Sequence, residues 1–311
     1  MKLKHLSILA IALLLSTTTV MAQRKTKITE PTIAEAPATG KQIKRKVAIG
    51  RFSNETQYAK GVFYDKENDP MGKQALDILS SKLAASGKFL LLERSDLATL
   101  LEEAKRGDTE LSTIGADYMI IGSVTEFGRK NTGKTGFLTS QKTQTVEATV
   151  AIRIVDVSNG LIIYSDEGKG SAEITNKTTL GMGGKAGYDA TLSDKAISEA
   201  IGQLVENIIN KCTDKPWRTY FINYDNEAIM IGGGSSQGIN VGDTFAVKTK
   251  GKKVKNPQTG VMIELPGKEI GKVTVEATAG DTPETEFSVV SYQGATIDTN
   301  KLTDYYIEEV K

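Results

Sequence analysis

The stretch VEATVAIRIVDVSNGLIIYS runs from Val146 to Ser165 and decides the fold. Apolar residues occupy every second position from Val146 to Ile154, which is the period of a strand with one buried face. Asn159-Gly160 follows and is the strongest short signal for a hairpin turn. The apolar run after this turn predicts the returning strand, so we expect a long β-hairpin here.

Strands and helices alternate on the N-terminal side of this hairpin. Strands are predicted for KVAIGRF (46–52), KFLLLER (88–94) and ADYMIIGSVTEF (116–127). Helices are expected from Pro70 to Gly87, from a Ser95 cap to Gly107, and over 191–211, because apolar residues recur there at three-to-four spacing. This order predicts an α/β domain over residues 45–212, with a mixed sheet, packed helices and a long β-hairpin.

The pattern changes after Pro216-Trp217. From residue 217 to residue 311 there is no helical period, and short β-rich runs alternate with Gly, Asn, Asp and Pro turns. This pattern is typical of a small all-β domain, either a barrel or a sandwich.

The N-terminal residues predict export. Residues 1–22 have the order of a signal peptide: Lys2 and Lys4, an apolar run from Leu6 to Leu15, and small residues before a cleavage site between Ala22 and Gln23. The apolar run is too short to span a bilayer, and no later stretch is long enough to form a transmembrane helix. Residues 23–44 have no apolar period and predict a flexible leader.

Composition excludes several kinds of site. The single histidine, His5, lies in the predicted signal peptide, so an imidazole-based triad and a histidine zinc site are excluded from the mature chain. The one cysteine, Cys212, cannot form an intramolecular disulfide and is expected to be a packed small side chain. The formal net charge of +1 gives no electrostatic reason to expect nucleic acid.

One motif matches a phosphate-binding loop letter for letter. Residues 128–135 read GRKNTGKT, which fits G-x-x-x-x-G-K-S/T, and Asp156 lies downstream as a candidate magnesium partner. The motif requires a helix after the loop, whereas GFLTSQKTQT follows here. A basic mobile loop is the favoured interpretation, and a nucleotide site at Lys134 and Thr135 is the alternative.

Two further patterns predict loops. Residues 181–187 (GMGGKAG) resemble a dinucleotide loop only superficially and are expected to be a connector. Asp65, Glu67 and Asp69 alternate like the start of a calcium loop, but Pro70 stands where glycine is needed, so a solvated acidic loop is expected. The residues therefore predict no catalytic, cofactor-binding or metal site.

Several stretches together resemble the CsgG/HfaB family, the curli production assembly and transport components. They are KVAIGRFSNET, KFLLLERSDLATLLEE, GADYMIIGSVTEF and VAIRIVDVSNGLIIYS, in this order, and the resemblance covers about residues 45–212. The better-known members are outer-membrane lipoproteins that form rings, in which a β-hairpin from each subunit builds a transmembrane barrel. The resemblance thus implies an envelope protein and leaves a homo-oligomer open.

The sequence departs from that family pattern twice. Gln23 stands where a lipidated cysteine is found, and the two segments expected to form polar loops, 128–145 and 174–190, show no apolar stripe that could face lipid. The C-terminal part, with GSSQG, VGD and PQTG, is similar to the C-terminal domain of the flagellar assembly protein T family.

Three functions are carried forward. The first is a non-catalytic exported cell-envelope protein of the curli assembly/transport type, acting as a periplasmic scaffold or secretion accessory. The second is a subunit of an oligomeric outer-membrane secretion channel for extracellular fibre proteins, and the third is an exported nucleotide-binding protein. The expected partners are envelope or secreted proteins and not nucleic acid, with no cofactor. The expected location is the periplasm, with outer-membrane association without a lipid anchor left open.

Overall fold

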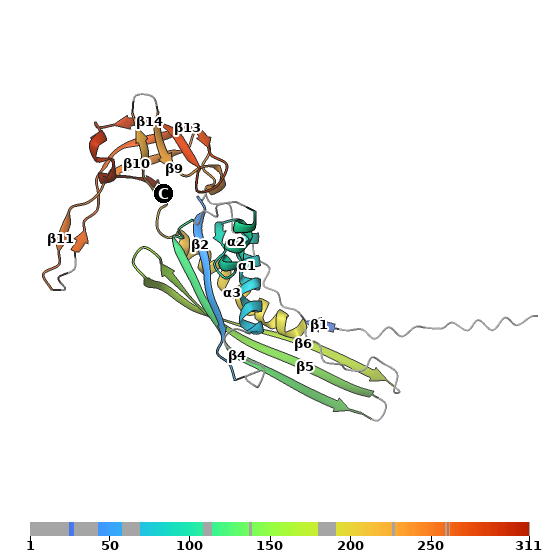
Figure 1. Cartoon of the computed structure of the whole chain (residues 1–311). Coiled ribbons are helices and arrows are strands. Elements are labelled where there is room, and N and C mark those ends of the chain that lie inside the picture. The colour runs from blue at the N-terminus through green and yellow to red at the C-terminus, as the bar shows by residue number, and fades with distance from the viewer. Residues whose placement is uncertain are drawn as a thin grey trace, which may run out of the picture.

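The computed structural model describes residues 25–27, 43–57, 69–107, 114–136, 139–179, 191–225, 228–258, 260 and 262–310. These residues form a mixed α/β domain and an antiparallel β-barrel (Figure 1). The predicted signal peptide, its cleavage site at Ala22 and Gln23, most of the predicted leader, and Asp65 and Glu67 lie outside the described residues. Residues 181–187 lie outside them as well.

The α/β domain is built on a six-stranded sheet in the order β1-β6-β5-β4-β2-β3. Strands β2, β3 and β4 are parallel, whereas β4, β5 and β6 form an antiparallel meander. In chain order the elements are β1 (Lys25–Lys27), β2 (Arg45–Asn54), α1 (Pro70–Ala85), β3 (Phe89–Leu92), α2 (Leu97–Arg106), β4 (Tyr118–Thr135), β5 (Thr139–Asp156), β6 (Leu161–Thr179) and α3 (Thr191–Thr213).

Helices α1 and α3 pack on one face of this sheet. The alternation predicted from the sequence is confirmed: Val150, Ile152 and Ile154 of β5 point inward and are buried against these helices. The predicted hairpin turn is also confirmed, since Gly160 has φ of 73° between β5 and β6. The buried face of α3 is the one that the apolar spacing predicts, and it ends with Cys212, which has no exposed surface.

Glycines in β6 let α3 approach the sheet closely. A Cβ at Gly168 would overlap the carbonyl oxygen of Ala200, and one at Gly170 would overlap that of Ala196. Beside them, Gln203 accepts a hydrogen bond from the backbone N–H of Lys169 (3.2 Å), and Glu199 accepts one from that of Ser171 (2.8 Å). Helix α3 therefore covers the face of β6 and also accepts hydrogen bonds from backbone N–H groups at its free edge.

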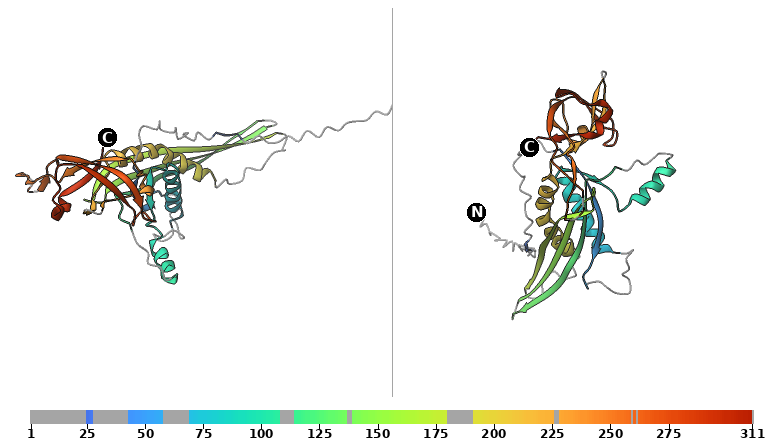
Figure 2. Two further views of the ribbon diagram at one scale, coloured as in Figure 1. Left: turned by 90° about the horizontal axis from the view of Figure 1, so that it is seen from above. Right: turned by 90° about the vertical axis from the view of Figure 1, so that its left-hand side faces the viewer.

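The two shorter helices differ in how they begin. Pro70 occupies the first turn of α1, as predicted, and Asp69 caps it by accepting a hydrogen bond from the N–H of Gly72 (2.7 Å). Asp69 is thus a capping residue. The predicted Ser95 cap of α2 is wrong: Asp96 is the N-cap without a side-chain bond, and Glu93 accepts from the N–H groups of Ser95 and Asp96. Helix α2 stands away from the sheet (Figure 2) and has no buried residue.

The C-terminal residues form a nearly closed barrel, one of the two alternatives that the sequence left open. Its sheet order is β7-β15-β10-β13-β14-β9-β8. The two edge strands, β7 and β8, follow each other in the chain with one residue between them. Strand β7 pairs with β15 and β8 pairs with β9, so the chain itself links the two edges of the sheet. The elements are β7 (Arg218–Thr219), β8 (Phe221–Tyr224), β9 (Ile229–Gly232), β10 (Thr244–Thr249), β13 (Glu269–Ala279), β14 (Phe287–Gly294) and β15 (Tyr305–Glu309), with the short hairpin β11 (Lys253–Lys255) and β12 (Met262–Glu264) and the 3₁₀ turns η1 (Ser235–Gln237) and η2 (Thr299–Asp304).

The two domains are joined by more than the linker. Ile43, at the end of the predicted leader, is 4% exposed and belongs to the hydrophobic core of the barrel. Next to it, the N–H of Lys44 donates to the carbonyl of Gln237 (2.9 Å). The buried guanidinium of Arg45 then donates to the carbonyl of Lys215 (2.8 Å) and to Glu309 (3.1 Å). The start of β2 therefore connects the α/β domain to the barrel.

Candidate functional site

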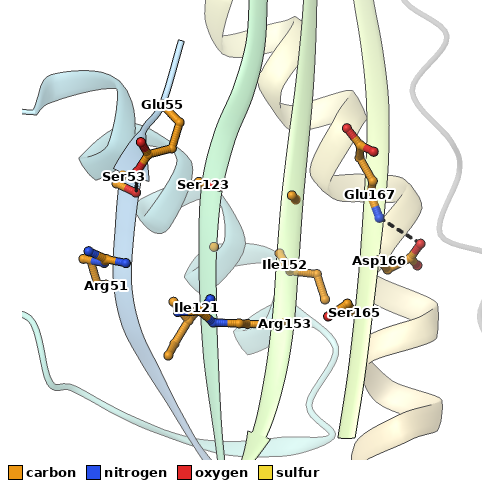
Figure 3. Close-up of a pocket in the computed structure, with 12 residues that line it drawn as sticks. Arg51, Ser53, Glu55, Ile121, Ser123, Ile152, Arg153, Ser165, Asp166 and Glu167 are labelled. Atoms are coloured by element: carbon orange, nitrogen blue, oxygen red, sulfur yellow. Dashed lines mark hydrogen bonds between the residues drawn. The ribbon is translucent and has the colours of Figure 1, made fainter. Parts of the chain in front are cut away.

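The face of the six-stranded sheet opposite the helices carries an open depression of about 550 Å³. Four strands contribute to it, and Figure 3 shows their side chains across the sheet. It is lined by Arg51, Ser53 and Glu55 at β2, Ile121, Gly122 and Ser123 of β4, Ala151, Ile152 and Arg153 of β5, and Ser165, Asp166 and Glu167 of β6.

Strand register brings these residues together. Ile121 is opposite Arg153, which is opposite Ser165, so the three form one row across β4, β5 and β6. The next row runs from Ser123 through Ala151 to Glu167. Side chains alternate between the two faces along a strand. Ile152 and Ile154 are buried under α3, so Arg153 between them is exposed on the open face.

Opposite charges are separated within this depression. Arg51 and Arg153 lie on one side, and within the described residues neither guanidinium forms an ion pair. On the other side, Glu55 accepts a hydrogen bond from Ser53 Oγ (2.7 Å), and Glu167 lies 3.4 Å from Thr125 Oγ1. Figure 3 shows the Arg153 side chain extending toward Ile121. Each of these arginines can bind a carboxylate or another anionic group.

A second depression of about 820 Å³ continues the same face toward the far end of the strands and shares Glu55 with the first. Its lining includes Glu126, whose carboxylate accepts from Thr149 Oγ1 (2.7 Å), and also Glu147 and Lys169. Together the two depressions give an extended polar surface along four strands. An open surface of this kind, built on paired strands, is suited to binding an extended protein segment.

The phosphate-binding loop suggested by residues 128–135 is wrong. These residues form the last part of β4, where Lys134 is opposite Gln141 and Thr135 is opposite Ser140. A strand that turns back into another strand offers no helix N-terminus to phosphates. Asp156, the candidate magnesium partner, is bonded instead to Lys215 (2.7 Å) and to Ser158 (3.0 Å from its N–H) at the domain junction.

The prediction of polar loops over 128–145 and 174–190 is also wrong, because their described residues lie almost entirely in strands. Apart from residues 137 and 138, which lie outside the described part, the whole of 128–145 is in β4, Gly136 and β5. Residues 174–179 continue β6, and 180–190 lie outside the described residues. Sequence patterns missed these strands because no apolar stripe marks them, although their many threonines are a signal that favours strands.

Sequence reasoning also missed Arg51 and Arg153 as candidate site residues. Both lie in stretches that the sequence identifies as strands, at positions alternate to the buried ones. The signal available was a charged residue on the outward face of a strand, and this signal is common on any solvated sheet. Only the register of β2, β4 and β5 brings them to one place.

Other groups that could carry chemistry are accounted for by packing. Burial raises the pKa of the Cys212 thiol to about 12. Burial also raises the pKa of Tyr118 to about 12. Among the described residues, no three His, Cys, Asp or Glu side chains are grouped closely enough to hold a metal ion. In the same part of the chain, no helix has the length and apolar character needed to cross a membrane.

Known proteins resemble this chain over the α/β domain and beyond. A protein of Neisseria meningitidis serogroup B (strain ATCC BAA-335 / MC58), NMB1126/NMB1164, which is named as a lipoprotein, is 35% identical over 179 residues, 57% of this chain and 80% of its own length. Among solved structures, the PelC dodecamer from Paraburkholderia phytofirmans is 18% identical and covers 59% of this chain and 97% of its own, with a TM-score of 0.26.

A second solved structure, lipoprotein GNA1162 from Neisseria meningitidis, is 15% identical and covers 55% of this chain and 99% of its own, with a TM-score of 0.24. The family model described as "Curli production assembly/transport component CsgG" matches residues 31–240, which include the α/β domain from β2 to α3 and the first strands of the barrel. The chain therefore belongs to the CsgG family.

Proposed function

We propose that the protein is a non-catalytic, exported cell-envelope protein that acts in the periplasm as a scaffold or secretion accessory. The observation that carries the proposal is the open polar face of the sheet, where Arg51 and Arg153 lie beside Ser123 without an ion-pair partner among the described residues. Membership of the CsgG family supports an envelope role. On this proposal the face binds a segment of an envelope or secreted protein whose carboxylates meet the two arginines.

A photo-crosslinking residue at Ser123 in the native cell tests this function. A defined crosslinked species is expected, and its yield should fall at least about tenfold when Arg51 and Arg153 are both changed to Glu, because a like-charge contact replaces an attractive one. The matched control is the pair Lys73→Glu and Lys105→Glu, two exposed lysines of α1 and α2 with the same total charge change. Equal crosslinking in both double variants would contradict the proposal.

A subunit of an oligomeric outer-membrane secretion channel is the second candidate. One observation favours it: β4, β5 and β6 continue well beyond the helices, and among the described residues β4 has no neighbour on its outer side after the pairing of Asn54 with Val124. An unpaired strand edge can accept a strand from a second copy of the chain. Recovery only in the outer-membrane fraction, resistant to high-salt washing, would favour this candidate over the scaffold.

The domain assignments belong to the same proposal. We propose a signal peptide over residues 1–22, the α/β domain over 45–212, and the barrel over 217–311 as a second docking surface. The order of its turns, with φ of 90° at both Gly238 and Gly242, is compatible with the resemblance to the flagellar assembly protein T domain. N-terminal sequencing of protein recovered from cells tests the cleavage, and Gln23 is the expected first residue.

A further inference from the structure

The hairpin of β11 and β12 stands apart from the barrel. It is a separate two-stranded sheet, and Figure 1 shows β11 extending away from the seven-stranded one. Among the described residues, none of its side chains belongs to the hydrophobic core of the barrel. An isolated two-stranded hairpin is only marginally stable in water, so a contact outside the described part of the chain would stabilise it.

Two glycines fix the base of this hairpin. A Cβ at Gly251 would overlap the carbonyl oxygen of Leu265, and one at Gly267 would overlap that of Thr249. Beside them, the backbone N–H of Leu265 donates to the carbonyl of Lys252 (3.0 Å). The two segments of chain approach so closely here that a side chain at either glycine would not fit. The hairpin therefore projects from a defined base between β10 and β13.

Strand register gives the hairpin one apolar face. Val254 is opposite Ile263, and the hydrogen bond between Leu265 and Lys252 continues the same register. Side chains that are opposite each other or two positions apart share a face, so Val254, Ile263 and Leu265 lie together. Ile263 and Leu265 are each 45% exposed. This face therefore presents apolar surface to water.

The rest of the hairpin and its base are basic. Five lysines are exposed here: Lys250, Lys252, Lys253, Lys255 and Lys268. Lys253 and Lys255 alternate with Val254 and so point to the face opposite the apolar one, where Met262 is opposite Lys255. Residues 250–268 contain these five lysines and one acidic residue, Glu264, a net charge of +4, whereas the whole chain has +1. Positive charge is therefore concentrated around the apolar face.

The apolar face is too small for a stable protein interface. Each strand has three residues, which corresponds to roughly 10 Å of length at about 3.3 Å per residue. A stable protein–protein interface buries about 800 Å² on each partner, far more than one face of this hairpin offers. A lipid surface has no such requirement, because each lysine near anionic headgroups adds to binding. An apolar face backed by lysines is also typical of segments that lie in the interface of a bilayer.

We propose that this hairpin lies on an anionic lipid surface. Val254, Ile263 and Leu265 enter the boundary between headgroups and acyl chains, and the five lysines extend their long side chains to the headgroups. Residues 259 and 261 of the turn, which lie outside the described residues, are not part of this contact. The contact gives a salt-sensitive membrane association, unlike the salt-resistant one expected of an inserted channel.

Vesicle sedimentation with the purified full-length exported chain tests the role of charge. Binding is expected to vesicles of phosphatidylcholine mixed with phosphatidylglycerol, much more than to phosphatidylcholine alone, and it should fall as salt is added. Changing Lys252, Lys253 and Lys255 together to Gln should weaken binding by about 100-fold, at about fivefold for each lysine. A control triple removes the same charge from exposed positions of the α/β domain: Lys73→Gln, Lys105→Gln and Lys130→Gln. It should bind within about threefold of the wild type.

The apolar face is tested by a second variant. Ile263→Gln and Leu265→Gln together should weaken binding to the mixed vesicles by at least about tenfold, because the apolar surface that leaves water on binding is lost. The matched control is Ile222→Gln with Val241→Gln, since these two barrel residues are 60% and 67% exposed and lie outside the hairpin. The control pair should bind like the wild type.

Three results would overturn the proposal, provided that the variants unfold at the wild-type temperature. The first is no binding of the wild type to the mixed vesicles. The second is equal binding of either hairpin variant and its control. The third is binding of the wild type to soluble polyglutamate without binding to vesicles, which would identify an acidic protein segment as the partner. None of these variants changes Arg51 or Arg153, so failure here is distinguishable from failure of the proposed scaffold function.

Discussion

The guanidinium of Arg45 and the carboxylate of Glu309 form an ion pair, with 3.1 Å between Nη2 and Oε2. The side chain of Arg45 is 5% exposed and that of Glu309 is 16% exposed, so the pair is largely removed from water. Glu309 also accepts a hydrogen bond from the N–H of Trp217 (3.0 Å). The first residue of β2 and the last residue of β15 are thereby fixed to the linker between the domains.

Replacing Arg45 by Met should lower the free energy of unfolding by about 3 kcal/mol, because it leaves a buried carboxylate without its charged partner. Trp217 is the only tryptophan and packs against Phe245 with 5.5 Å between ring centroids, so its fluorescence during urea unfolding reports on the junction. Arg51→Met, on the same strand but exposed, should change the free energy by no more than about 0.5 kcal/mol. Equal losses in the two variants would show that the ion pair is not what stabilises the junction.

Gly170→Ala should destabilise the α/β domain by about 3 kcal/mol, because the added methyl group overlaps the carbonyl oxygen of Ala196 in α3. Gly128→Ala is the matched control, since nothing lies within 4 Å of a Cβ at that strand position. Thermal unfolding followed by circular dichroism checks both. An unchanged transition for Gly170→Ala would mean that α3 can move away from β6 at little cost.

The sequence predicts an element of this structure when one face of that element is buried, because a buried face leaves a periodic pattern of apolar residues. The hairpin at Asn159-Gly160, helix α3 and the strand at 116–127 were predictable because one face of each is apolar and buried. The ends of β4 and β5 over residues 128–136 and 139–145 were not, because the strand period has no apolar signal there. The site shows the same limit: Arg51 and Arg153 are in predicted strands, but their proximity depends on a register that local patterns do not contain.

The carboxylate of Asp156 should make the free energy of unfolding depend on pH in acidic solution. Burial alone would raise its pKa, but the hydrogen bonds from Lys215 and Ser158 outweigh burial and lower the pKa below its usual range. A lowered pKa in the folded state stabilises the protein above the unfolded pKa, near about 3.9, and the contribution is lost as the pH falls through the folded value.

Lys215→Met should therefore cost about 1 kcal/mol at neutral pH, a modest value because the Lys215 side chain is 60% exposed. The difference from wild type should shrink toward zero as Asp156 becomes protonated, in urea unfolding measured across a series of acidic buffers. A difference that stays constant with pH would contradict the assignment of Asp156 as the partner that matters. Lys252→Met, at an exposed barrel position, serves as the control and should show no such trend.

Cys212 should resist thiol reagents in the folded protein. Its pKa is raised to about 12 by burial, so the reactive thiolate is scarce at neutral and mildly alkaline pH, and the side chain has no exposed surface. Modification by an aromatic disulfide reagent should proceed at the rate of unfolding and accelerate in urea. A rapid reaction in buffer alone would show that the C-terminal end of α3 opens without global unfolding.

The insertion of Ile43 into the barrel, beside the Arg45 to Glu309 pair, has a consequence for how the chain acquires its structure. The two members of that pair are 264 residues apart, and β15 is synthesised after the other described strands. Closing such a long loop is entropically costly and slow compared with local contacts. Neither the barrel core nor the junction can therefore be completed before β15 has emerged from the ribosome, and the nascent chain stays incompletely folded until then, a state compatible with passage through a narrow export pore.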